Sequence, residues 1–294
     1  MGYLSHRVDP DELKPGDHIY TWRTAFTYAH HGIYVGGRKV IHFTSDQENA
    51  MSNSGWNLSS SLPVPSSCLN SSSLNSPSLN SPCLNSSCLN SSCLNSIDCG
   101  FSLPNCDSGS CLCAYYCGFH QPESGVTFSC LNCFIGTGSL YLFQYGVTIS
   151  EHVTKLRGGT STTAPCDPPQ VVIHRAIYLL NSETGFGKYD LVRNNCEDFA
   201  LYCKTGHMIP IKHVSTGSSG QVNFIYNAPW MPALVSIALR VACGTVAGVL
   251  GGGYTVWKHY RNRCESDIGV RDDAVKVNVE DVGAFRRYYQ AGGM

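Results

Sequence analysis

Charge is scarce in this 294-residue chain, since Asp, Glu, Lys and Arg make up only 14% of it. Soluble domains usually carry about 25%, and part of the deficit falls on Asn49–Ile97, which contains no charged residue. The two signs nearly cancel, with 20 basic and 21 acidic residues. Because no basic stripe stands out, we expect no nucleic acid among the partners.

An apolar leader is also missing. Met1–Leu13 is polar and charged and has no h-region of the kind that secretory signals carry. Sixteen cysteines would suggest disulfides in an exported chain. We therefore expect an intracellular protein on the cytosolic side, where clustered cysteines more often bind metal or do chemistry.

Residues 49–110 are expected to be a low-complexity insertion. Leucine recurs there every five residues, usually as Leu-Asn-Ser, and a period of five fits neither a helix face nor a strand face. Ser/Asn/Pro repeats bury too little apolar surface to offset the entropy of ordering, so we predict disorder. A pentapeptide-type β-solenoid is the structured alternative, although six repeats make a small stacked core.

Two histidines are expected to come together in residues 1–48, the N-terminal part of the catalytic domain. His30–Val35 and Val40–Thr44 are short apolar runs around a Gly-Gly turn, which predicts a β-hairpin. Because side chains alternate along a strand, His30 and His42 share one face, which we expect to line a cleft. The opposite, apolar face carries Ile33, Val35, Ile41, Phe43 and a structural His31. We interpret the other histidines as ordinary polar residues: His18, His120, His152, His174 and His207.

Residues 111–215 are expected to complete the domain and to contain a helix with a cysteine at its start. Asn195 is a good N-cap, and Gly206 is a suitable C-terminal cap for a helix over Asn195–Lys204. Cys196 then occupies the first helical position, where free N–H groups and the helix dipole stabilise a thiolate. This segment alone leaves two interpretations open, a nucleophile and a small residue packed at a helix start.

Together these segments resemble the lecithin:retinol acyltransferase-like (LRAT) domain. The resemblance rests on His30–Val35, on His42 and on Asn195–Phe199, which follow one another in the family's order, and on Lys14–Asp17 at the first strand. The LRAT domain belongs to the circularly permuted NlpC/papain-like cysteine hydrolases. It therefore implies an α+β fold with an antiparallel sheet and a helix bearing the nucleophilic cysteine. The similarity is greatest to the plant branch, while Asp198 replaces a frequent histidine and the insertion is not a common feature.

The resemblance also implies an activity and roles. In the family the first histidine is the base, the second orients it and the cysteine forms a thioester, which assigns these roles to His30, His42 and Cys196. We expect a thiol-dependent acyltransferase or acyl hydrolase of lipid metabolism, acting on a lipid-type or other acyl ester and needing no cofactor. An NlpC-type amidase or peptidase and a catalytically idle binding domain are the alternatives.

A structural zinc site is a further expectation. Two cysteine pairs with spacings of three and two residues are separated by twelve residues, which resembles a four-cysteine zinc site. A loop of cysteines without metal is the alternative. The four candidate ligands are Cys113, Cys117, Cys130 and Cys133.

The C-terminal third is divided into an apolar segment, residues 228–257, and a polar tail, residues 258–294. Pro232–Trp257 is long enough to span a bilayer of ~30 Å as a helix, and Gly244, Gly248 and Gly252 have the spacing of close helix contacts. Arg240 opposes insertion, and a helix packed on the catalytic domain is the alternative. We expect membrane association through this segment.

Overall fold

The computed structural model describes residues 5–23, 28–45, 119–121, 124–155, 157–210, 218–226 and 245–291. Helices and one large antiparallel sheet occur together, so the expected α+β class is confirmed. The predicted insertion, residues 49–110, lies outside the described residues. So does most of the apolar segment 228–257, of which the structure describes the residues from Thr245 onward.

Seven strands form the main sheet in the order β1-β7-β2-β3-β4-β6-β5, and every pair is antiparallel. The predicted histidine hairpin is confirmed as β3–β4, in which Gly32 pairs with His42. Its turn needs positive φ at Gly36, Gly37 and Arg38, a conformation that glycine adopts without strain. The strands are β1 (His6–Arg7), β2 (His18–Arg23), β3 (Tyr28–Gly36), β4 (Lys39–Phe43), β5 (Phe119–His120), β6 (Val126–Cys130) and β7 (Leu140–Leu142).

The helices agree with the sequence where local signals were strong. Helix α5 spans Pro169–Asn181, and the predicted cysteine helix is α6 (Cys196–Thr205), which ends at Gly206 with φ 71°. The alternating run Ala274–Val279 forms only the two-residue strand β9 (Val275–Lys276), which pairs with β8 (His207–Met208). The remaining helices are η1 (Pro10–Glu12), α3 (Leu131–Ile135), α4 (Ile149–Thr154), α7 (Gly220–Tyr226), α9 (Thr245–Ser266), η5 (Val279–Asp281) and α10 (Val282–Ala291).

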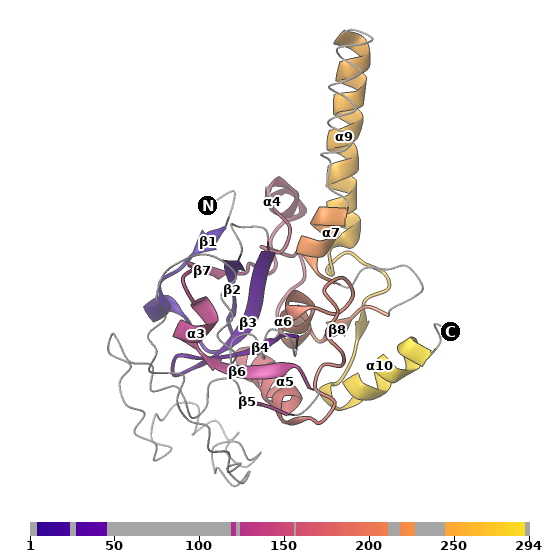
Figure 1. Ribbon diagram of the computed structural model, residues 1–294. Coiled ribbons are helices and arrows are strands. Elements are labelled where there is room, and N and C mark those ends of the chain that lie inside the picture. Colours follow the sequence, from indigo (N-terminus) through magenta and orange to yellow (C-terminus); the bar gives the residue numbers. More distant parts are fainter. Residues whose placement is uncertain are drawn as a thin grey trace.

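The sheet is covered differently on its two faces (Figure 1). Helices α5 and α6 pack on the face that carries Ile33, Ile41 and Phe43, and together they form the largest hydrophobic cluster. On the other face the short helix α3 contributes Leu131 and Phe134 to a smaller cluster. The catalytic residues predicted from the sequence are therefore divided between two layers, with α6 on one face of β3 and α3 on the other.

The C-terminal region, expected to be a polar tail, contributes to the main core. Val277, Val279 and Val282 are buried in the same cluster as the α6 residues. The Tyr202 hydroxyl of α6 donates a hydrogen bond of 3.0 Å to the Val277 carbonyl. Residues near the end of the chain are thus packed against the helix that begins with Cys196.

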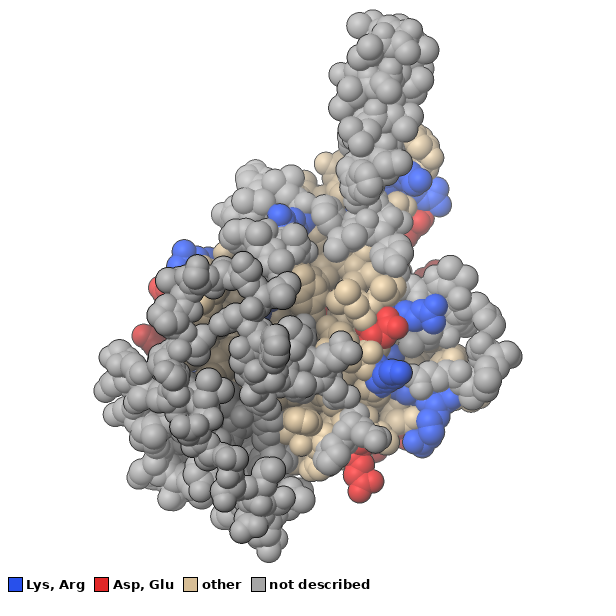
Figure 2. Space-filling view, viewed as in Figure 1, with Lys and Arg blue, Asp and Glu red and all other residues tan. Residues whose placement is uncertain are grey.

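Helix α9 projects from the body of the molecule, and α7 lies beside its base (Figure 1). No helix in the described part of the chain combines the length and apolarity needed to cross a membrane. Basic and acidic side chains are interspersed over the described surface near the base of α9 and around α10 (Figure 2).

Candidate active site

A capping box fixes the start of α6. The Asn195 side chain accepts hydrogen bonds from the backbone N–H of Glu197 and of Asp198, at 2.8 and 3.2 Å, and the Asp198 carboxylate accepts one from Asn195 N–H at 2.9 Å. These reciprocal bonds satisfy backbone donors that a helix start otherwise leaves unpaired. Cys196 therefore stands at the first helical position, as the sequence predicts.

Cys196 is fully buried, and its thiol lies against the first residues of β3. Its sulfur lies 2.8 Å from the Tyr28 hydroxyl and 3.7 Å from the Ala29 carbonyl oxygen. The Tyr28 hydroxyl also lies 2.8 Å from that of Tyr189, in the loop before α6. Burial raises the pKa of Tyr28 well above its usual value, so this hydroxyl stays protonated and can donate to a negatively charged neighbour.

His30 and His42 contact each other directly. His30 Nε2 lies 3.0 Å from His42 Nδ1, and His42 Nε2 lies 2.8 Å from the Ser129 hydroxyl. Gly32 permits this approach, because a Cβ there would lie 3.1 Å from the His42 Cβ. Burial lowers the pKa of His30 well below its usual value and that of His42 to about 3. Both rings are therefore neutral near pH 7.

The histidine pair is buried, whereas the sequence suggested a face lining a cleft. His30 and His42 are 6% and 8% exposed, and both rings pack against Phe134 of α3. The thiol approaches the same strand from the side of α6, at Tyr28 and Ala29. The structure thus brings Cys196 next to the residues that precede His30 in β3.

A second histidine pair, which the sequence did not reveal, lies on the α6 face of the sheet. His18 Nε2 is 2.9 Å from His31 Nδ1, and His18 Nδ1 is 2.7 Å from the Tyr145 hydroxyl. Both imidazoles are buried, and burial lowers the pKa of His31 to about 3. This packing fits a structural role for His31, whereas His18, expected to be an ordinary polar residue, is buried in the pair. Antiparallel β2–β3 pairing, which sets His18 opposite Ile33 and Tyr20 opposite His31, could have indicated the contact.

Glu197, the residue after the thiol, connects α6 with α7. Its carboxylate accepts hydrogen bonds from the Ser219 hydroxyl, Gly220 N–H and Gln221 N–H at 2.6, 2.9 and 3.1 Å. Burial raises its pKa to about 7 despite these bonds. The sequence offered no signal for these contacts, because Glu197 and the segment Ser219–Gln221 are more than twenty residues apart.

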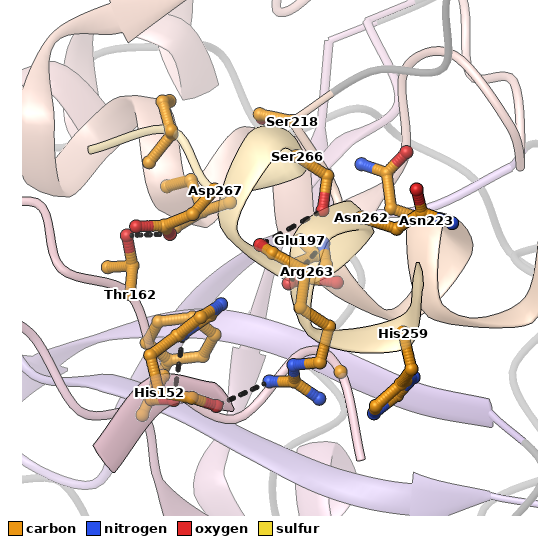
Figure 3. A pocket seen from close by; sticks show the side chains of 16 residues that line it. His152, Thr162, Glu197, Ser218, Asn223, His259, Asn262, Arg263, Ser266 and Asp267 are labelled. Atoms are coloured by element: carbon orange, nitrogen blue, oxygen red, sulfur yellow. Dashed lines mark hydrogen bonds between the residues drawn. The ribbon is translucent and has the colours of Figure 1, made fainter. Parts of the chain in front are cut away.

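A polar pocket lies beyond Glu197, between the ends of α4, α7 and α9 (Figure 3). Arg263 of α9 donates to the Lys155 and His152 carbonyls at 3.1 and 2.9 Å, and Asp267 accepts from Thr162 at 2.5 Å. The side chains that line it are thus mostly engaged with one another. Such a lining suits an interface between elements better than an acyl chain, which needs apolar walls.

The structure gives no support to the predicted zinc site. Cys130 is the N-cap of α3, where its sulfur accepts a hydrogen bond from Cys133 N–H at 3.3 Å. Cys113 and Cys117 lie outside the described residues. Within the described ranges, no group of three His, Cys, Asp or Glu side chains could hold a metal ion.

Comparison with known proteins extends the resemblance. The family model "Lecithin retinol acyltransferase" matches residues 11–96 and 104–209, which include His30, His42 and Cys196. Protein LEAD-SENSITIVE 1 of Arabidopsis thaliana is 37% identical over 282 residues, which cover 96% of this chain and 90% of that protein. No solved structure gives a significant match. This chain is a member of the lecithin retinol acyltransferase family, with a close plant relative.

Proposed function

We propose that this protein is a thiol-dependent acyltransferase or acyl hydrolase that carries the acyl group of a lipid-type ester on Cys196. The observation that supports it most is the buried thiol at the first position of α6, beside the Tyr28 hydroxyl, in a chain of this family. Acylation of Cys196 by an activated ester, detected as a mass adduct on its peptide, tests the proposal. The fold is proposed to be the permuted papain-like one, because a helix begins with the thiol and packs on an antiparallel sheet bearing the histidines.

Because both histidines are neutral, one of them can receive the Cys196 proton when the thiol reacts. In the proposed mechanism His30 Nδ1 takes the thiol proton, because Nε2 contacts His42; the ring packs on the α3 face of the sheet, whereas the thiol reaches β3 from the side of α6. The resting pair is a thiol and a neutral imidazole, and the proton moves as the sulfur attacks the ester carbonyl. His42, held by Ser129, fixes the ring orientation of His30 in the way that a third group orients a catalytic base.

Tyr28 is the proposed donor to the charge that develops in the reaction. When the sulfur bonds to the carbonyl carbon, the carbonyl oxygen becomes an oxyanion close to the sulfur. The Tyr28 hydroxyl, 2.8 Å from the sulfur and supported by the Tyr189 hydroxyl, is positioned to donate to it. The carbon–oxygen ester bond then breaks, and the alcohol leaves with the proton held by His30. Water or another acceptor next attacks the thioester and restores the thiol.

We expect His30→Ala and His31→Ala to fail in different ways. His30→Ala removes the base and should lower kcat about 10²–10⁴-fold. His31→Ala removes a buried ring that contacts His18 and stacks on Tyr20 at 5.2 Å, so it should chiefly lower Tm. Ester turnover and thermal melting of both variants measure the difference. A folded His31→Ala enzyme with the larger loss of kcat would move the base to the α6 face.

We also propose that α9 contacts a membrane surface. Tyr254 and Trp257 are 56% and 53% exposed on this projecting helix, and the Arg261 guanidinium lies 5.3 Å from the Trp257 ring centre. Exposed aromatic and basic side chains together are typical of helices that lie in a bilayer interface. Trp257→Ala should weaken sedimentation with vesicles containing phosphatidylserine several-fold. Tyr288→Ala on α10, where the side chain is 74% exposed, is the matched control and should bind as the wild type.

A further inference from the structure

The Gln221 side chain pairs with the backbone of β3 beside the thiol, as a neighbouring strand would. The Gln221 amide oxygen accepts a hydrogen bond of 3.0 Å from Ala29 N–H, and its amide nitrogen donates one of 3.0 Å to the Ala29 carbonyl. The residue of β3 nearest to this point that pairs with β4 is Gly32. Ala29 is fully buried, so leaving its backbone N–H and carbonyl without hydrogen bonds would destabilise the fold.

Gln221 is itself tied to the residue that follows Cys196. Its backbone N–H and that of Gly220 donate to the Glu197 carboxylate, and the Ser219 hydroxyl does the same. The segment Ser219–Gln221 is thus held at the start of α6 before its glutamine side chain reaches β3. Gln221 is only 5% exposed, so both ends of this connection are shielded from water.

These contacts form a closed ring around the thiol. From Cys196 the ring runs through Glu197 and Gln221 to Ala29, and the Ala29 carbonyl lies 3.7 Å from the Cys196 sulfur. Two donors, the Gln221 amide and the thiol, therefore share one carbonyl oxygen. A carbonyl accepts hydrogen bonds but donates none, so it favours the protonated thiol over the thiolate.

We propose that Gln221 is a positioning residue for Cys196, which holds β3 against the start of α6 and, by donating to the same Ala29 carbonyl, weakens the bond of that carbonyl to the thiol and so favours ionisation. This role deepens the proposed acyl chemistry and rests on it. The same ring fixes the main chain immediately before His30, so the spacing between thiol and base depends on Gln221. The residue acts through its two hydrogen bonds to Ala29.

Several ionisable groups surround the thiol and enter its pH dependence. Tyr28 of β3 and Tyr189 contact it directly or through one hydroxyl, and burial keeps Tyr28 protonated. Glu197 and Asp198 follow in α6, and burial raises the pKa of both carboxyl groups, that of Glu197 to about 7. His30 follows Ala29 in β3 and is neutral near pH 7. All of these groups remain when Gln221 is replaced. A change in the pH profile of Cys196 alkylation is therefore due to loss of the Gln221 amide.

The test is the pH profile of Cys196 alkylation by iodoacetamide, followed by mass spectrometry of the Cys196 peptide. Gln221→Met removes both hydrogen bonds with little change of volume, and Gln221→Asn shortens the side chain without adding charge. We expect the rate at pH 7 to fall about tenfold in each, as the profile moves up by about one pH unit. Gln170→Met, an exposed glutamine of α5, is the control and should keep the wild-type profile.

Failure of the Gln221 role and failure of the proposed acyl chemistry can be told apart, because alkylation of Cys196 needs no acyl donor. A shifted profile in a protein that no ester acylates would keep the role of Gln221 and reject the acyltransferase. Wild-type profiles in folded Gln221→Met and Gln221→Asn would overturn the role. Loss of the fold in both, with Gln170→Met still folded by circular dichroism, would also overturn it, since Gln221 would then be holding the domain together.

Discussion

Replacing Cys196 with Ala should abolish covalent labelling by an activated lipid ester and reduce ester turnover to the uncatalysed rate. The sulfur is the only atom of this side chain that can form the thioester, and Tyr28 and Ala29 hold it in place. The fold should survive, because the substitution removes one buried atom and alanine is a good helix residue. Intact-mass spectrometry after incubation with the ester, with circular dichroism in parallel, measures both expectations.

Cys203 supplies a matched control within the same helix. It is also fully buried, and burial raises the pKa of its thiol far above the usual value, so its sulfur should be inert. Cys203→Ala should therefore keep both labelling and turnover. An ester adduct that persists in Cys196→Ala and disappears in Cys203→Ala would reject Cys196 as the nucleophile. Loss of labelling with an ester but rapid cleavage of an amide by the wild type would favour the amidase alternative.

Local patterns predicted much of this site. Strand alternation placed His30 and His42 on one face of a hairpin, and the two rings do contact each other. The sequence Asn195–Asp198 predicted the helix start, because a capping box is a signal contained in four consecutive residues. Both features depend on neighbours in the chain or across one tight turn, which a single sequence displays directly.

The unpredicted parts depend on contacts between distant segments. Burial of His30 under Phe134 follows from α3, about a hundred residues later in the chain. The contact between His18 and Tyr145 spans 127 positions, and that between Gln221 and Ala29 spans 192. No periodicity or spacing encodes such pairs, because they result from how the sheet is ordered and which loops cover it. The assignments of His30, His42 and Cys196 to their roles remain predictions.

The alternating run at the C-terminus shows how context changes a correct local signal. Ala274–Val279 reads as a strand, and Val275–Lys276 does pair, but only with the two residues of β8. Beyond Lys276 the chain turns into η5, so Val277 and Val279 enter the main core as parts of a packed segment. Their apolar character was visible in the sequence, whereas their partner was not.

Removing residues 274–294 should therefore unfold the domain, although the truncation deletes none of the proposed catalytic residues. Val277, Val279 and Val282 pack in the α5–α6 cluster, and full burial of such a side chain contributes about 1.5–3 kcal/mol. Their summed loss approaches the total stability of an ordinary domain, about 5–15 kcal/mol.

The same truncation removes Arg286, which donates to the Asn194 side chain at 2.5 Å just before the thiol helix. Thermal melting and size-exclusion chromatography of the truncated chain should show loss of the cooperative transition and aggregation. Removal of residues 292–294 alone, beyond α10, is the control and should leave Tm unchanged. A truncated protein with wild-type Tm and normal Cys196 labelling would show that the valines pack without stabilising the core. Because the truncation disturbs folding, loss of vesicle binding after it carries no information about α9, for which Trp257→Ala is the cleaner variant.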